Sequence, residues 1–258
     1  TLLLTSGCIG NIRKIIRPRL ITFDVTGTLL MTKLEDYVEI GSQHGLSLDR
    51  RKLARSFKNT FHRLSLEHPV YGKHTGIGWE NWWRQLVHSV FKDQHNYISD
   101  ATLIRCYGTS MCWHKYPGTI ELLDYLKKKE LILGIISNFD ERLEAILEDI
   151  RIRSYFSFVL TSYDLGVEKP DTLIFDEALR LTKKRHSINI SPQQALHIGD
   201  SVNNDYIVFV SFHCYPQSFI LINTILFTNF YNNVFNKTLL FHISYLKKLK
   251  ITKLKTTN

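Results

Sequence analysis

The stretch Leu20-Ile-Thr-Phe-Asp-Val-Thr-Gly-Thr-Leu29 decides the fold of this chain. It opens on four apolar or β-branched residues, which favour a buried strand, and this strand ends at the carboxylate of Asp24. Gly27 follows as a turn residue. A buried strand that delivers an acidic side chain to a loop is typical of parallel sheets, which bind ligands at the carboxyl ends of their strands.

Further apolar runs along the chain predict three more strands, at residues 131–136, 157–161 and 195–199. Segments with helical periodicity accompany them, at residues 118–129, 140–150 and 171–182. Strands that alternate with helices and are apolar along their whole length favour an α/β fold. We therefore expect a doubly wound parallel sheet with helices on both faces.

A block of helical periodicity with polar faces is inserted after the first strand, and we expect it to form a separate helical cap. Its tryptophans, Trp79, Trp82 and Trp83, either line a substrate entrance or pack inside the cap, and packing is the preferred interpretation. The predicted organisation is a basic N-terminal extension at 1–19, a core at 20–35 and 113–205, the cap at 36–112, and an atypical C-terminal segment at 206–258.

The composition of the 258-residue chain, with 44% hydrophobic and 22% charged residues, excludes a disordered, collagen-like or coiled-coil protein. The formal net charge of +9 lies at the two ends. Residues 1–20 carry +4 and residues 206–258 carry +6, which leaves −1 for residues 21–205. The basic balance is therefore no argument for a nucleic-acid partner, and we expect none.

The four cysteines (Cys8, Cys106, Cys112 and Cys214) show no paired spacing. This pattern predicts neither a disulfide framework nor a zinc site and favours a reducing compartment, the cytoplasm or the nucleus. The Arg/Lys run without acids in residues 1–20 leaves mitochondrial targeting as the alternative.

The segment 206–258 contains no Gly, Ala, Arg or acidic residue, which marks a sharp change of composition. It has three interpretations: a membrane anchor at 207–230, which its polar interruptions make the weakest; a basic tail that contacts phosphate or anionic lipid; or sequence that is not native to the domain. We favour the third. The C-terminal part of the core is then expected to be missing or replaced, which leaves the strand at 195–199 without a neighbour.

Polar side chains follow the predicted strands where each one ends: Asp24, Ser137-Asn138 and Asp200, with Lys169 on a loop beside them. Carboxylates that converge repel one another unless a hard divalent cation lies between them, and oxygen ligands favour Mg²⁺. A cation, an ammonium group and backbone donors together suit a phosphoryl group, and an adjacent carboxylate can act as nucleophile.

Four motifs in order carry a resemblance: Asp24-Val-Thr-Gly-Thr-Leu29, Ser137-Asn138, Lys169-Pro170 and Gly199-Asp-Ser-Val-Asn-Asn-Asp205. Their order and spacing resemble the haloacid dehalogenase-like hydrolase superfamily over about residues 20–205, and the helical insert resembles its C1-type cap. The resemblance implies a Rossmann-like core and a phosphohydrolase that acts on a small phosphorylated molecule. The sequence gives no indication of oligomeric state.

The resemblance implies a role for each catalytic position. Asp24 would attack phosphorus and form an aspartyl-phosphate, while Ser137 and the backbone amide of Asn138 would hold the phosphoryl oxygens. Lys169 would offset charge between the nucleophile and the phosphate. These roles suit phosphoryl transfer, which depends mainly on positioning and charge stabilisation.

The resemblance also implies a Mg²⁺ site made by Asp24, Asp200 and the carbonyl of Thr26, with Asp205 supporting the metal's water shell. The family's phosphatases carry a second, proton-transferring aspartate where this chain has Thr26. Loss of such a group costs about 10²–10⁴-fold in rate. We therefore expect a slow or narrow phosphohydrolase, with a catalytically impaired phosphate-binding or regulatory protein as the alternative.

Overall fold

The computed structural model of the chain describes residues 18–43, 49–91, 107–206 and 219–221. Its strands are β1 (Leu20–Phe23), β2 (Leu30–Met31), β3 (His114–Lys115), β4 (Ile132–Ser137), β5 (Phe158–Thr161), β6 (Ala195–Gly199) and β7 (Phe219–Leu221). Its α-helices are α1 (Leu34–Gln43), α2 (Arg50–Glu67), α3 (Gly78–Val90), α5 (Thr119–Lys128), α6 (Leu143–Asp149), α7 (Ser162–Leu165) and α8 (Leu173–His186).

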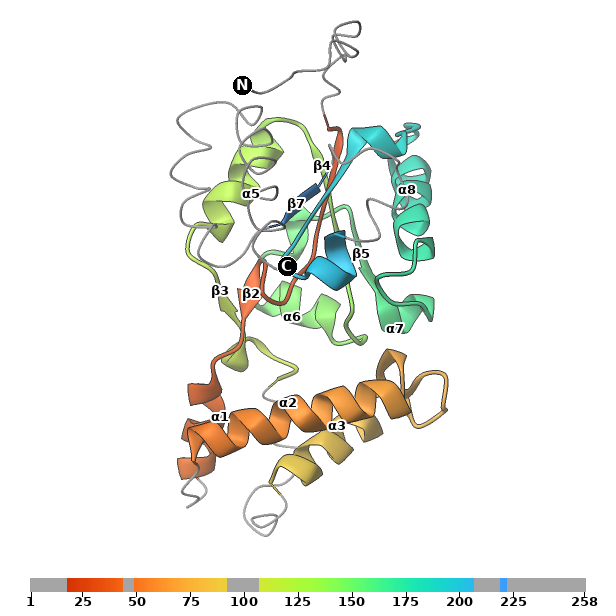
Figure 1. The fold of residues 1–258 in the computed structure, drawn as a ribbon. Coiled ribbons are helices and arrows are strands. Elements are labelled where there is room, and N and C mark those ends of the chain that lie inside the picture. The colour runs from red at the N-terminus through yellow and green to blue at the C-terminus, as the bar shows by residue number, and fades with distance from the viewer. Residues whose placement is uncertain (1–17, 44–48, 92–106, 207–218, 222–258) are drawn as a thin grey trace, which may run out of the picture.

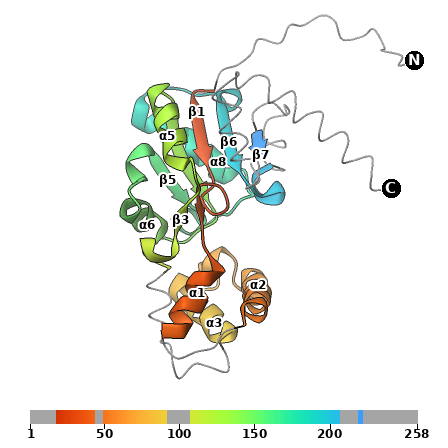
Figure 2. The same ribbon diagram turned by 90° about the vertical axis from the view of Figure 1, so that its left-hand side faces the viewer.

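The central sheet has the order β5-β4-β1-β6-β7, and every neighbouring pair is parallel. Side chains alternate across β1: Ile21 and Phe23 pack with α5 and α6, whereas Leu20 packs with α8 on the other face. Helices therefore cover both faces, as Figures 1 and 2 show for α5 and α8. The predicted α/β fold with a doubly wound parallel sheet is confirmed.

Two predicted helices differ from the observed ones at their ends. Helix α6 begins at Leu143, later than the predicted residue 140, because the Asp140 carboxylate accepts hydrogen bonds from the backbone and guanidinium of Arg142 and holds this stretch as a loop. Helix α8 continues to His186, beyond the predicted residue 182, and ends at Ser187, whose φ of 56° is left-handed.

Strand β7 corrects the expectation for the C-terminal segment. Phe219–Leu221 pairs in parallel with β6, so that His197 lies opposite Phe219 and Gly199 opposite Leu221. The sheet therefore has a neighbour for β6 where we expected none, while the origin of the segment 206–258 stays a prediction. The pairing supplies backbone partners to an edge that would otherwise be unpaired and apolar.

Helices α1, α2 and α3 form a second body, here called the helical unit, which lies apart from the sheet in Figure 1. Trp82 and Leu64 are fully buried at its centre, where α2 packs on α3. The chain leaves the sheet through β2 and returns through β3, and these two short strands pair antiparallel, with Leu30 opposite Lys115.

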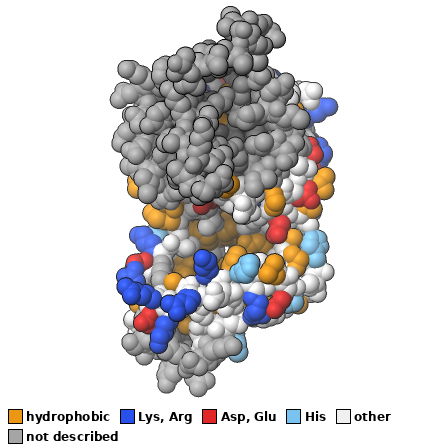
Figure 3. Space-filling model, in the orientation of Figure 1, with side chains coloured by type: hydrophobic (Ala, Val, Ile, Leu, Met, Phe, Trp, Pro, Cys, Tyr) orange, Lys and Arg blue, Asp and Glu red, His pale blue; other side chains and the backbone are white. Residues whose placement is uncertain are grey.

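Charge is distributed unevenly inside the nearly neutral region. Helix α2 carries exposed basic side chains on consecutive turns: Arg50, Arg51, Lys52, Arg55, Lys58 and Arg63. Figure 3 shows Lys and Arg side chains gathered over the end of the helical unit where α1 and α2 meet. Of these side chains, Arg50 pairs with Glu35 and Arg63 with Glu67.

Two further expectations bear on compartment. Cys112 takes part in a disulfide, which the spacing of the cysteines did not predict. In the ranges that the structure describes, no helix is both long and apolar enough to cross a membrane. The candidate anchor at 207–230 lies outside the described residues except for β7. The candidate targeting segment at 1–20 lies outside them except for residues 18–20.

Candidate active site

The predicted site residues meet at one edge of the sheet. Asp24 directly follows β1, Ser137 ends β4, and Asp200 directly follows β6. Because these strands are parallel neighbours, their carboxyl ends lie together. The backbone N–H of Asp24 donates to the carbonyl of Ile198 over 2.8 Å, which extends the pairing of β1 with β6 up to the candidate nucleophile.

Lys169 is the centre of the site. Its buried ammonium donates to Oδ1 of Asp24 over 2.7 Å and to Oδ1 of Asp205 over 2.7 Å. Ser137 Oγ donates to the same oxygen of Asp24 over 3.1 Å. Burial alone would lower the pKa of Lys169, but the two carboxylates outweigh it and the pKa is raised. The ammonium therefore keeps its charge beside Asp24.

Asn138 fixes the backbone of the loop that carries Lys169. Its side-chain oxygen accepts from the backbone N–H of Lys169 over 2.7 Å, and its side-chain nitrogen donates to the carbonyl of Lys169 over 2.8 Å. This pair of bonds ties the residue after β4 to the loop after α7. Asn138, which was predicted to hold phosphate through its backbone amide, thus also helps to set the position of the Lys169 ammonium.

Asp205 lies behind Lys169 and is only 1% exposed. Its Oδ1 accepts from Lys169 and faces His197 Nε2 at 3.2 Å, and its Oδ2 accepts from the backbone N–H of Ser201 over 2.9 Å. Burial alone would raise the pKa of Asp205, but His197 and Lys169 hold it well below its usual range. In this structure the carboxylate serves Lys169, and its role beside a metal stays a prediction.

Asp200 is exposed at the mouth of the site and packs against the loop after β1. A Cβ built on Gly27 would lie 2.3 Å from Asp200 Oδ2, and Gly27 has a φ of +82°. Only glycine suits this position, because the turn is left-handed and the carboxylate needs the space. Desolvation, followed by the negative charges of Asp24 and Asp205, raises the pKa of Asp200 to about 6.

The fit of a divalent cation rests on charge. With its carboxylates ionised, the cluster of Asp24, Asp200, Asp205 and Lys169 has a formal charge of −2. Lys169 is already shared, and Asp200 makes no ion pair within the described part of the chain. An excess of carboxylate oxygens beside a phosphate-type site suits Mg²⁺. No group of three or more His, Cys, Asp or Glu side chains among the described residues is arranged to hold an ion.

Thr26 is exposed on the loop between Asp24 and Gly27. A threonine hydroxyl does not transfer a proton near neutral pH, so the second carboxylate expected from the family pattern has no equivalent at this position. The exposure of Thr26 means that a larger or charged side chain can be accommodated there.

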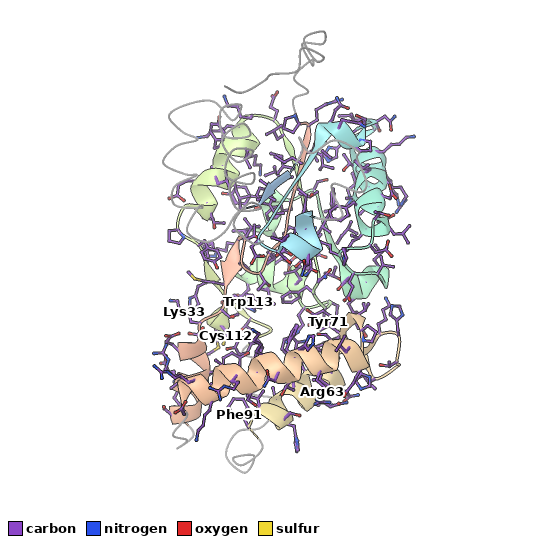
Figure 4. All side chains as sticks on the ribbon, in the orientation of Figure 1. Lys33, Arg63, Tyr71, Phe91, Cys112 and Trp113 are labelled. Carbon is purple, nitrogen blue, oxygen red and sulfur yellow. The ribbon has the colours of Figure 1, made fainter. Side chains whose placement is uncertain are left out.

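The helical unit contacts the loop after β4. Tyr71 points from the unit toward the sheet (Figure 4), and its hydroxyl donates to the carbonyl of Asn138 over 2.9 Å. The pKa of Tyr71 is raised by burial and by the charge of Asp140, which keeps the phenol protonated as a donor. Its φ of 51° is left-handed, a conformation that costs a non-glycine residue about 1–3 kcal/mol.

Arg142 and Asp140 complete this contact. The Arg142 guanidinium lies 4.8 Å from the ring centre of Trp79 and 4.9 Å from that of Trp83, and it pairs with Asp140 over 2.7 Å. Trp83 Nε1 donates to the same carboxylate over 2.7 Å. The preferred interpretation of the tryptophans as packing inside the cap is confirmed for Trp82 and Trp83, whose rings contact each other and Phe61. Trp79 and Trp83 in addition contact Arg142 on the sheet side.

Sequence reasoning missed three contributors: His197, which lies inside the predicted strand at 195–199, and the Asp140–Arg142 pair. A signal for His197 existed, because a polar side chain inside an apolar strand needs a buried partner. The partner itself cannot be read from the sequence, since Asp205 and Thr22 approach His197 only in the folded chain.

Comparison with known sequences agrees with this geometry. The family model described as a haloacid dehalogenase-like hydrolase matches residues 18–212, so the similarity continues past Asp205, where we expected it to stop. The rhythmically expressed gene 2 protein of Drosophila melanogaster is 37% identical over 211 residues, which cover 76% of this chain and 80% of that protein. Haloacid dehalogenase-like hydrolase domain-containing protein 3 of Xenopus laevis is 35% identical over 208 residues, covering 76% and 83%.

Solved structures show the same fold. The putative HAD-hydrolase YfnB from Bacillus subtilis, bound to magnesium, has a TM-score of 0.59 at 16% identity, with 83% of this chain and 98% of that chain covered. The L-2-haloacid dehalogenase RSc1362 has a TM-score of 0.58 at 19% identity, covering 80% and 87%. Because the family model matches most of the length of this chain, the chain belongs to the haloacid dehalogenase-like hydrolase family.

Proposed function

We propose that this hydrolase is a Mg²⁺-dependent phosphohydrolase that acts on a small phosphorylated molecule through an aspartyl-phosphate on Asp24. One observation carries the proposal: the buried Lys169 ammonium is bonded to Asp24, and Ser137 is bonded to the same carboxylate oxygen. A carboxylate held beside a cation and a hydroxyl at the rim of a parallel sheet suits attack on phosphorus.

In the first step, a carboxylate oxygen of Asp24 forms a bond to phosphorus, and the bond from phosphorus to the leaving alkoxide breaks. Oδ1 already accepts from Lys169 and Ser137, which leaves Oδ2 for the attack. Ser137 Oγ then turns its donor from Asp24 to a phosphoryl oxygen, joined by the backbone N–H of Asn138. Mg²⁺ held by Asp24, Asp200 and the Thr26 carbonyl would offset the charge of the phosphoryl oxygens.

In the second step, water attacks phosphorus, inorganic phosphate leaves, and the Asp24 carboxylate is restored. Both steps move a proton: the leaving alkoxide takes one up in the first step, and the attacking water gives one up in the second. Thr26 cannot provide this transfer, so bulk water does, and we expect turnover to be slow or confined to esters with easy leaving groups.

The test is turnover of a panel of phosphate esters with Mg²⁺ by the full chain and by Asp24→Asn. We expect measurable release of phosphate by the full chain and none by the variant. Asp176→Asn is the matched control, because Asp176 is an exposed aspartate in the first turn of α8. Turnover that survives in Asp24→Asn contradicts the assignment of the nucleophile.

A second candidate, a phosphate-ligand-binding or regulatory protein on the same fold, is favoured by the absence of a proton-transferring group at Thr26. Calorimetry with inorganic phosphate and Mg²⁺ separates the two candidates. Binding without turnover of any ester supports the second candidate, whereas turnover supports the first. For either one we propose a partner that is a small phosphorylated molecule, with no nucleic acid.

A further inference from the structure

A chain of buried polar side chains runs away from Lys169 into the sheet. Oδ1 of Asp205 contacts both Lys169 and His197, and His197 in turn contacts Thr22 on the neighbouring strand. His197 is 0% exposed and Thr22 is 4% exposed. Burying a polar side chain in the middle of a parallel sheet costs free energy unless the side chain has a hydrogen-bond partner. We therefore ask what role this row of hydrogen-bonded side chains has besides packing.

The direction of the hydrogen bonds follows from chemistry. An ionised Asp205 only accepts, so the facing nitrogen of His197, Nε2 at 3.2 Å, carries the proton. The other nitrogen, Nδ1, lies 2.9 Å from Thr22 Oγ1 and accepts the proton of that hydroxyl. Thr22 has an alternative acceptor in the carbonyl of Leu196, but at 3.5 Å it is the weaker one.

The ring of His197 is held from its other sides as well. Phe175 of α8 meets it edge-on, with ring centres 5.2 Å apart and an interplanar angle of 84°. The backbone of His197 pairs with Thr22 on β1 and with Phe219 on β7. A ring fixed in this way presents Nε2 to Asp205 in a single orientation.

We propose that His197 is a positioning residue: its Nε2–H orients Asp205 so that the carboxylate seats the Lys169 ammonium against Asp24. Asp205 alone has freedom to rotate about its side-chain bonds, and Lys169 has a long flexible stem. The hydrogen bonds of Asp205 to His197 and to the Ser201 backbone remove that freedom. The catalytic consequence rests on the proposed function, whereas the protonation of the ring does not.

The first experiment reads the ring directly. Long-range ¹⁵N NMR of the full chain, with the His197 signals assigned by their loss in His197→Gln, is expected to show Nε2 protonated and Nδ1 unprotonated. A ring that carries its only proton on Nδ1 overturns the proposal, because Asp205 then receives no donor. This result does not depend on any enzymatic activity, so it stands even if no ester is hydrolysed.

The second experiment separates positioning from stability by comparing His197→Phe with His197→Gln. Phenylalanine keeps the aromatic shape and loses the donor, while glutamine places an amide N–H near the position of Nε2. We expect kcat to fall about 10-fold to 100-fold in His197→Phe, the usual cost of losing an outer partner of a site residue, with KM changed little. His197→Gln is expected to recover most of the loss.

Thr22→Val and Thr22→Ser repeat the comparison one step further out, which covers the case in which His197→Phe fails to fold. Valine removes the hydroxyl and serine retains it, so we expect a smaller fall of kcat in Thr22→Val and none in Thr22→Ser. An unchanged kcat in folded His197→Phe, or losses that follow the melting temperature in all four variants, overturns the positioning role.

Discussion

The carboxylate of Asp200 occupies the space that a side chain at Gly27 would fill. A Cβ at Gly27 would lie 2.3 Å from Asp200 Oδ2. The turn after β1 therefore leaves room for the residue after β6. Because Gly27 has no side chain, the carboxylate of Asp200 can lie against this turn.

Gly27→Ala should displace Asp200 and raise the Mg²⁺ concentration needed for half-maximal turnover. Left-handed backbone costs alanine about 1–3 kcal/mol on its own, so stability will also fall. Gly76→Ala is the matched control, because Gly76 has a φ of +76° and nothing within 4 Å of its Cβ position. Comparable Mg²⁺ titrations for the two variants would show that the contact with Asp200 is unimportant.

The pKa of about 6 for Asp200 predicts how pH affects the metal-free protein. Folding disfavours the ionised form, so the contribution of Asp200 to the free energy of unfolding falls as pH rises from about 4 to about 6 and stays low above that. Asp200→Asn should therefore stabilise the protein at pH 7.5 more than at pH 4.

Urea denaturation at both pH values measures this effect, with Asp176→Asn as the control. Mg²⁺ should reduce the advantage of Asp200→Asn at pH 7.5, because the cation favours the ionised carboxylate. An equal effect of the substitution at both pH values contradicts the predicted ionisation.

Thr26→Asp should raise turnover of phosphate esters, because it supplies a carboxyl group for proton transfer at an exposed position. General acid–base catalysis contributes about 10²–10⁴-fold, so we expect a gain of about 10-fold or more. The asparagine of Thr26→Asn has nearly the same shape as aspartate but no titratable proton, so this variant should give no gain. Steady-state rates of the two variants on one ester decide the matter, and equal rates count against the explanation for slow hydrolysis.

Arg142→Lys should loosen the helical unit from the sheet, because lysine loses the paired bonds to Asp140 and the stacking between Trp79 and Trp83. A hydrogen bond to a charged group contributes about 1.5–3 kcal/mol, so the loss is measurable. Acrylamide quenching of tryptophan fluorescence should increase. Arg84→Lys on the exposed side of α3 should leave quenching unchanged, and a similar increase there would argue against a specific contact.

The sequence was sufficient to predict the strands that carry the site, because β1, β4, β5 and β6 are mostly apolar. A polar residue ends β4 and β5 and directly follows β1 and β6. It did not reveal β7. Phe219–Leu221 is a run of only three residues in a longer apolar stretch that Pro216 and Asn223 interrupt, and it is too short for periodicity to identify a strand.

The site could be predicted as a set of residues but not as a network. The order of the motifs placed Asp24, Ser137 and Lys169 at one edge of the sheet, and the structure brings them into contact. The contacts of His197 with Thr22 and of Tyr71 with Asn138 join residues far apart in the chain. Such pairs depend on tertiary packing, which local periodicity does not encode.

The most direct test of the central claim is to trap the phosphorylated enzyme. The full chain is mixed with a reactive phosphate ester and Mg²⁺, quenched in acid within seconds, digested and analysed by mass spectrometry. Without a proton-transferring group at Thr26, the acyl-phosphate should accumulate, and we predict a single phosphorylated peptide, the one that contains Asp24. Phosphate on another residue, or turnover with no phosphorylated peptide at any quench time, would contradict the account.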